Sequence, residues 1–115
     1  MIPTDWLKSV GIDITKKGHN TYKLKATGFM DLTVETWQDG TRQYVSMCHY
    51  GESNGDLMKD PEIMFQVTPK RIIYHEMQND YVPMYSTNHF EIQDFMENTW
   101  LSNLIAQGHK IENSD

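Results

Sequence analysis

Polar side chains that could hold a metal ion lie close together between positions 49 and 62. They are His49, Glu52, Asn54, Asp56, Asp60 and Glu62. Hard divalent cations such as Mg²⁺, Mn²⁺ and Ca²⁺ prefer several oxygen ligands, and carboxylates supply them. One hypothesis is therefore a divalent-metal-dependent enzyme that uses His49, Asp56, Asp60 and Glu62.

The same segment also fits a simple polar loop. An EF-hand aligned on Gly55 would begin at Tyr50 and end at Pro61, where calcium loops need Asp and Glu, so an EF-hand is excluded. Asn54-Gly55 is typical of a turn with positive φ, and Asp60-Pro61 can begin the next strand. Turn chemistry explains each residue, so we favour this interpretation and expect no catalytic residue and no cofactor.

Other common catalytic motifs do not occur in the chain. It has no glycine-rich phosphate loop, no dinucleotide-binding fingerprint and no nucleophile elbow, and its five histidines do not form a zincin motif. The single cysteine, Cys48, precedes His49 on a predicted strand, where adjacent side chains point to opposite faces. We therefore expect Cys48 to be a buried structural thiol.

The charge of the chain is unevenly distributed. The formal net charge is −6, and no Lys or Arg lies between Arg71 and Lys110, whereas five acidic residues do. Within this stretch, residues 81–85 hold large apolar side chains beside Pro83, which belongs on a sheet edge because it lacks an N–H. We expect a basic protein partner to bind a surface formed by Glu76, Asp80, Tyr81, Met84, Tyr85, Glu91, Asp94 and Glu97.

One basic segment allows an alternative. Lys16, Lys17, Lys23 and Lys25 flank Tyr22, and such a group could contact nucleic acid through phosphate pairing and base stacking. The acidic balance of the whole chain argues against binding to a duplex. A nucleic-acid accessory module therefore stays an alternative, and we do not expect nucleic acid to be the partner.

The elements that position these residues follow from the hydrophobic periodicity. Alternation predicts strands over residues 21–27, 30–35, 42–50, 62–67 and 71–78, with a loop at 51–60 and an edge segment at 81–85. Helices are predicted over residues 4–10, capped by Thr4, and from Asn88 to Gly108, with Met96, Trp100, Leu101, Leu104 and Ile105 on the apolar face. The chain of 115 residues is predicted to form one α+β domain, an antiparallel meander of about five strands with a short N-terminal and a longer C-terminal helix.

Three blocks of the chain resemble a family of small uncharacterised domains from bacteriophages and bacterial mobile elements. The blocks are His49-Tyr50, then Asn54-Gly55-Asp56-Leu57-Met58 with Asp60-Pro61-Glu62, and finally Trp100, Asn103 and Ala106-Gln107-Gly108. The resemblance implies a genomic setting and no reaction. Many short acidic proteins in that setting bind and block host machinery, so we expect a non-catalytic inhibitor of a host defence nuclease, of the anti-restriction or anti-CRISPR type. The absence of a signal sequence and of a long apolar run predicts a location in the cytoplasm of the bacterial host, away from the membrane.

Overall fold

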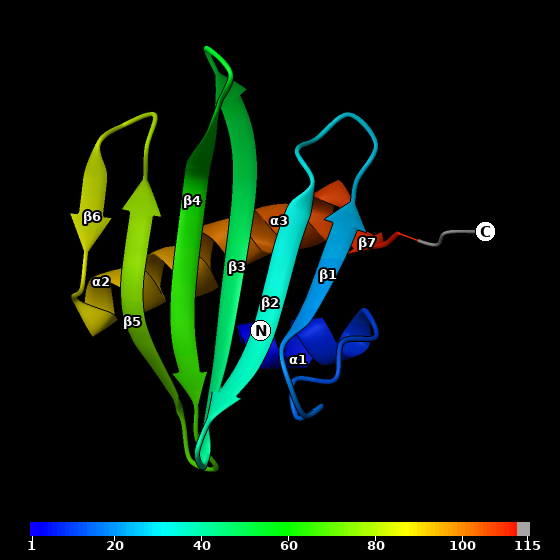
Figure 1. Cartoon of the computed structure of the whole chain (residues 1–115), viewed down its shortest axis with the longest axis vertical. Helices are drawn as coiled ribbons and strands as arrows, with labels where there is room; N and C mark the ends of the chain where they lie inside the picture. The colour runs from blue at the N-terminus through cyan, green and yellow to red at the C-terminus, as the bar shows by residue number, and fades with distance from the viewer. Residues whose placement is uncertain (113–115) are drawn as a thin grey trace.

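The computed structural model describes residues 1–112 and contains a seven-stranded antiparallel β-sheet (Figure 1). Its strands are β1 (Asn20–Lys25), β2 (Leu32–Asp39), β3 (Arg42–Ser53), β4 (Asp56–Val67), β5 (Ile72–Asn79), β6 (Met84–Ser86) and β7 (Lys110–Ile111). The order is β6-β5-β4-β3-β2-β1-β7, so the chain forms a meander and then returns to pair β7 with β1. This confirms the antiparallel meander but exceeds the predicted five strands. The two residues of β7 are too few to show an alternating pattern.

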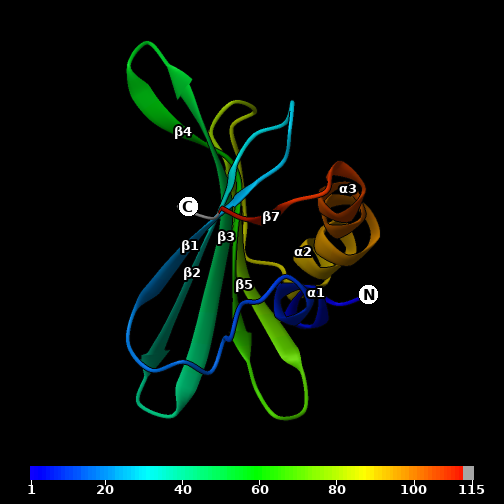
Figure 2. The same cartoon turned by 90° about the vertical axis from the view of Figure 1, so that its right-hand side faces the viewer.

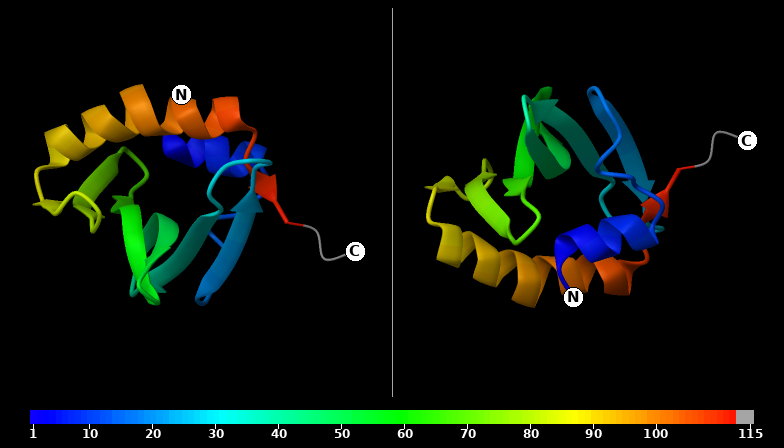
Figure 3. Two further views of the ribbon diagram at one scale, coloured as in Figure 1. Left: turned by 90° about the horizontal axis from the view of Figure 1, so that it is seen from above. Right: turned by 90° about the horizontal axis from the view of Figure 1, so that it is seen from below.

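The helices cover one face of the sheet (Figure 2). They are α1 (Pro3–Ser9) and a continuous rod formed by α2 (His89–Phe95), the π-helical turn η1 (Met96–Trp100) and α3 (Leu101–Gln107). The rod runs across the strands, and α1 lies beside it (Figure 3). None of the described helices is long and apolar enough to cross a membrane.

The helix ends follow the sequence signals at three of four positions. Asn88 caps α2, since its side-chain oxygen accepts hydrogen bonds from the backbone N–H groups of Phe90 and Glu91. Gly108 ends α3 with φ at 79°, and Gly11 follows α1 with φ at 96°. The prediction of Thr4 as N-cap is wrong: Ile2 is the N-cap and Pro3 begins the helix, where its missing N–H costs nothing.

The core lies between the sheet and the helices. Alternate residues of the strands face the helices and are fully buried, among them Val34, Val45, Ile63 and Phe65. The rod contributes Ile92, Met96, Trp100, Leu101 and Leu104, and α1 contributes Trp6 and Leu7. The predicted apolar face is wrong at Ile105, which is 43% exposed. The π-helical turn adds a residue between Met96 and Leu101, which rotates the following turn and carries Ile105 out of the core.

The predicted loop at residues 51–60 is instead part of a long β-hairpin. Strands β3 and β4 pair up to Ser53 and Asp56, so the connection is only Asn54-Gly55, with φ values of 52° and 85°. The expected Asn-Gly turn is therefore confirmed, and its positive φ values match the tight hairpin turns of this dipeptide. The loop was overestimated because the polar residues before and after the turn belong to a hairpin arm that extends beyond the helices (Figure 2).

Candidate functional site

A β-bulge places polar residues against the C-terminal helix. Cys48 pairs with Glu62 and Tyr50 pairs with Lys59, so Asp60 and Pro61 together lie opposite His49. Such bulges redirect side chains and are frequent next to functional sites. Here the bulge lies over the part of the sheet that faces η1 and α3, and Trp100 of η1 meets the His49 ring edge-on, with the ring centroids 5.5 Å apart.

The bulge and the helix enclose a pocket of about 310 Å³, which we call the His49 pocket. Its polar and aromatic lining comes from His49, Asp60, Pro61, Trp100, Asn103 and Gln107, and Phe29 and Met30 complete it. The three blocks that carry the sequence resemblance each contribute to this lining, although they are far apart in the chain. Sequence reasoning did not find this convergence, because the bulge and the π-helical turn that produce it leave no periodic signal.

His49 is held in one tautomer. Its Nδ1 lies 2.9 Å from the backbone carbonyl oxygen of Asp31, so Nδ1 carries the proton and donates it to that oxygen. The side chain is 8% exposed. Burial lowers the pKa of His49, and the neighbouring His109 lowers it further, against the opposing effects of the Asp31 carbonyl, Asp60 and Asp31. The ring is therefore neutral at pH 7 and its Nε2 carries a lone pair.

His109 fixes the wall of the pocket on the other side. Its Nε2 donates to the backbone carbonyl of Met30 at 2.8 Å, and its ring centroid lies 5.6 Å from that of His49. This hydrogen bond connects the loop between β1 and β2 to His109, which directly follows Gly108 at the end of α3. The loop that carries Phe29 and Met30 is thereby held over the pocket.

The four residues of the metal hypothesis do not converge. His49 and Asp60 line the His49 pocket, but Asp56 lies at the hairpin turn and the Glu62 carboxylate contacts Lys59 Nζ at 3.1 Å. Among residues 1–112 no group of three or more His, Cys, Asp or Glu side chains could hold a metal ion. Cys48 is buried, and burial raises the pKa of its thiol to about 12, which is the opposite of what a nucleophilic cysteine needs.

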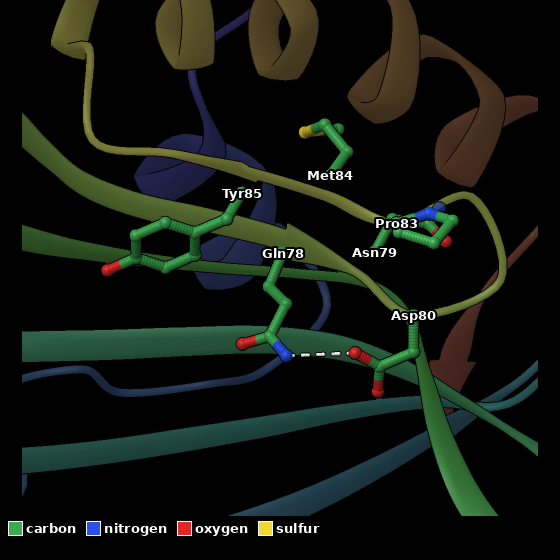
Figure 4. A pocket seen from close by; sticks show the side chains of 6 residues that line it. All are labelled: Gln78, Asn79, Asp80, Pro83, Met84 and Tyr85. Carbon is green, nitrogen blue, oxygen red and sulfur yellow. Dashed lines mark hydrogen bonds between the residues drawn. The ribbon is translucent and has the colours of Figure 1, made fainter.

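The predicted partner-binding residues at 81–85 lie at the outer edge of the sheet. Strand β6 pairs with β5 only, and Tyr81, Val82, Met84 and Tyr85 are 43%, 70%, 39% and 61% exposed. We call these four side chains the edge patch. Tyr81 reaches back across β4, where its hydroxyl donates to the Glu52 backbone carbonyl of β3 at 3.3 Å, and Met84 and Tyr85, as neighbours on β6, point to opposite faces of the sheet. Next to it is an open pocket of about 530 Å³ whose lining includes Asn79, Pro83, Met84 and Tyr85 (Figure 4).

Two of the five predicted acidic residues serve the fold, and the other three lie at the surface. Asp80 accepts hydrogen bonds from the backbone N–H of Lys59 and from Gln78 Nε2, each at 2.8 Å, and these bonds lower its pKa. Glu97 accepts a hydrogen bond from the buried Tyr74 hydroxyl at 3.0 Å. Both therefore serve the fold. Glu91 and Asp94 are exposed on α2, while Glu76 accepts a hydrogen bond from Tyr85 at 3.0 Å on the sheet face away from the helices. The acidic residues thus do not form one continuous face.

The lysine segment also separates into two faces. Lys23 and Lys25 are exposed on β1, but Tyr22 packs against the core on the opposite face. Lys25 Nζ lies 3.2 Å from the Glu112 carboxylate. The aromatic rings on the lysine side are instead His19, Trp37 and Tyr44, which stack on one another with centroids 5.9 and 5.7 Å apart. Trp37 and Tyr44 are a cross-strand pair that stabilises the sheet, and His19 stacks on Trp37 from the residue before β1.

One exposed apolar residue near the edge patch was not predicted. Phe90, in the first turn of α2, is 77% exposed and makes an edge-on contact with His89. The sequence does hold a signal for it, since Phe90 falls outside the Ile92 and Met96 stripe of the helix. Phe90 belongs to the same corner of the molecule, because α2 begins directly after β6.

Comparisons with known proteins place the chain in a family. No curated protein and no solved structure matches the sequence. A family model described as a domain of unknown function, DUF6908, matches residues 7–110. This match spans nearly the whole sheet and the helical rod, including the His49 pocket and the edge patch, and the chain belongs to the DUF6908 family.

Proposed function

We propose that the protein is a non-catalytic binding module that docks a protein partner through the edge patch. The observation that carries this proposal is the exposure of four large apolar side chains on and beside the outermost strand. Strand edges and exposed apolar patches favour association with another chain, and Tyr and Met are enriched at such interfaces.

The charge around the edge patch favours a basic partner. No Lys or Arg occurs between Arg71 and Lys110, so β5 and α2 carry acidic side chains, and neither they nor β6 carry a Lys or Arg. Glu76 contacts Tyr85, and Glu91 accepts a hydrogen bond from Ser86 at 3.0 Å at the end of β6. Charges at the rim of an interface steer association and make it sensitive to salt.

The genomic setting implied by the sequence resemblance suggests what the partner is. In bacteriophages and mobile elements, a basic host protein that such a module would block is a defence nuclease with a cationic nucleic-acid channel. We include this anti-defence role in the proposal, and the partner is then met in the bacterial cytoplasm. The alternatives have weaker support, because the metal candidates are dispersed and Tyr22, the aromatic residue of the lysine segment, packs against the core.

The test uses two matched substitutions. Val82→Glu places a charge in the edge patch, and Leu57→Glu places the same charge on the β3–β4 hairpin, where the native side chain is 72% exposed against 70% for Val82. Immobilised wild-type protein is incubated with host lysate, the captured protein is identified and purified, and its dissociation constant is measured for each variant. Val82→Glu is expected to weaken binding at least about tenfold, and Leu57→Glu to leave it unchanged.

The acidic contribution is tested separately. Glu91→Lys and Asp94→Lys are suitable, whereas reversing Glu97 would also break its bond to Tyr74. The proposal expects a lower association rate for the reversed variants at low salt, with the difference shrinking as salt is added. Equal binding by wild type, Val82→Glu and the reversed variants, or a lysate that yields no partner, would refute the proposed docking surface.

A further inference from the structure

The His49 pocket holds an acceptor atom that the protein itself does not use. His49 Nε2 has no hydrogen-bond partner among the described residues, although the side chain is only 8% exposed. Among residues 1–112, Thr36 Oγ1 is the one side-chain polar atom that is both fully buried and without a hydrogen-bond partner. His49 Nε2 also has no partner, so it is not fully buried and is accessible to solvent. Because Nδ1 is occupied by the Asp31 carbonyl and the ring lines the pocket, the lone pair of Nε2 opens into it.

Asp60 supplies a second acceptor in the same pocket. Its Oδ1 accepts a hydrogen bond from Asn79 Nδ2 at 3.0 Å, while Oδ2 has no partner among the described residues. No Lys or Arg lines the pocket, so Asp60 gives it a negative charge. An anion is therefore disfavoured there, and a ligand that donates hydrogen bonds and carries positive charge is favoured.

The walls and the volume restrict that ligand further. The flat side chains of Trp100 and Pro61, together with Met30, suit a planar group, and about 310 Å³ admits a small one. His49 and Asp60 are the only strong metal ligands in the lining, fewer than the three His, Cys, Asp or Glu side chains of a metal-binding group. A guanidinium is planar, stacks on aromatic rings, and carries N–H donors in several directions, so it can serve two acceptors at once.

We propose that the His49 pocket binds a guanidinium group, with His49 Nε2 and Asp60 Oδ2 as acceptors and Trp100 as a wall. This goes beyond the proposed function, since it concerns a different surface and does not depend on the edge patch. The guanidinium belongs either to a free small molecule or to an arginine side chain of another protein. The two sources present the same chemistry to the pocket.

The first experiment follows the ¹⁵N-labelled protein by NMR during titration with methylguanidinium chloride. The resonances of His49 Nε2 and the Trp100 indole N–H are expected to move and to saturate. Tetramethylammonium chloride, which has the charge but no N–H donor, is expected to produce no saturable change at these atoms. The proposal is overturned if methylguanidinium gives no saturable change, or if tetramethylammonium gives the same one.

Matched variants identify the acceptors. Asp60→Asn keeps an oxygen for Asn79 but removes the charge, and Asp56→Asn removes the same charge at the hairpin turn outside the pocket. The affinity for methylguanidinium is expected to fall about tenfold in Asp60→Asn and to stay unchanged in Asp56→Asn. The affinity for methylguanidinium is expected to fall similarly in His49→Phe, which keeps an aromatic ring beside Trp100 but has no acceptor. Equal losses in Asp60→Asn and Asp56→Asn would show that only net charge matters and would overturn the site.

A capped tripeptide, acetyl-Gly-Arg-Gly-amide, distinguishes the two sources. Tighter binding of the tripeptide than of methylguanidinium supports an arginine side chain of a protein as the ligand. Exclusion of the tripeptide, with methylguanidinium still bound, supports a free small molecule. Both results require the guanidinium site that the first experiment tests.

Discussion

The hydrogen bond between Tyr74 and Glu97 decides whether Glu97 belongs to the fold or to a binding surface. Tyr74 on β5 is 2% exposed, and its hydroxyl donates to Glu97 Oε2 on η1 at 3.0 Å, which ties the sheet to the π-helical turn. Burial and the Glu97 charge raise the pKa of Tyr74, so the hydroxyl remains a donor throughout the neutral range. Tyr74→Phe removes the donor and keeps the ring.

The stability lost in Tyr74→Phe can be calculated from the charge and the burial of the two hydrogen-bonding groups. A hydrogen bond to a charged group contributes about 1.5–3 kcal/mol, and the low end applies here because Glu97 is only half-buried and can bind water when the hydroxyl is lost. We expect Tyr74→Phe to lower the free energy of unfolding by about 1.5 kcal/mol. With an unfolding entropy of about 2.1 cal/mol/K per residue, the melting temperature falls by about 6 °C.

The assay is urea unfolding of a double-mutant cycle formed by Tyr74→Phe and Glu97→Ala, with Asp94→Ala as the control. Asp94 is exposed on α2 and accepts a hydrogen bond from Asn98, which is also exposed, so its removal is expected to change stability by less than about 0.5 kcal/mol. The two variants of the pair are expected to be non-additive by about 1 kcal/mol. Additive effects, or a Glu97→Ala loss no larger than that of Asp94→Ala, would refute the structural role of Glu97.

Three further predictions concern other buried or crowded groups. Stability should fall as the pH rises from about 9 toward 12, because the unfolded chain releases the Cys48 proton while the folded protein, with a Cys48 pKa of about 12, retains it. Burial also raises the pKa of Tyr50 and Tyr74, so Cys48→Ala should reduce this loss in pH-dependent unfolding without abolishing it. Stability should also fall as the pH drops below about 6.5, because the unfolded chain protonates His49 more readily than the folded protein does; His49→Phe should reduce this slope, and an unchanged slope would argue against the buried neutral ring. Gly51→Ala should cost about 1 kcal/mol, since the added methyl group collides with the Tyr81 hydroxyl; the cost should vanish in a Tyr81→Ala background, and a cost that persists there would point to the backbone instead.

Local signals in the sequence predict the elements that depend on neighbouring residues. Asp39-Gly40 and Asn54-Gly55 mark the two turns of the β2–β3 and β3–β4 hairpins, and Asn88 and Gly108 mark the ends of the helical rod. Each works through one or two backbone groups that the residue itself can satisfy or relieve. These parts of the fold therefore follow from short-range physical chemistry.

Features that depend on distant pairing could not be predicted. The bulge opposite His49 arises from the register between β3 and β4, and the π-helical turn at Met96–Trp100 adjusts the rod to the sheet beneath it. Both break the periodicity that sequence analysis uses. The His49 pocket lies where these two irregularities meet, which explains why the residues appeared only as separate blocks.

The sequence predicts part of the edge patch. Pro83 and the large apolar side chains beside it indicate a sheet edge, and β6 is indeed the outermost strand. The roles of the acidic residues could not be predicted, because spacing along the chain does not reveal that Asp80 and Glu97 accept structural hydrogen bonds from β4 and β5.

The comparison of Val82→Glu with Leu57→Glu in binding to a captured and purified host partner tests the docking surface most directly. Our account predicts that the charge at Val82 weakens the complex at least about tenfold, while the same charge at Leu57 leaves the dissociation constant at the wild-type value. Equal dissociation constants for the two variants would contradict it.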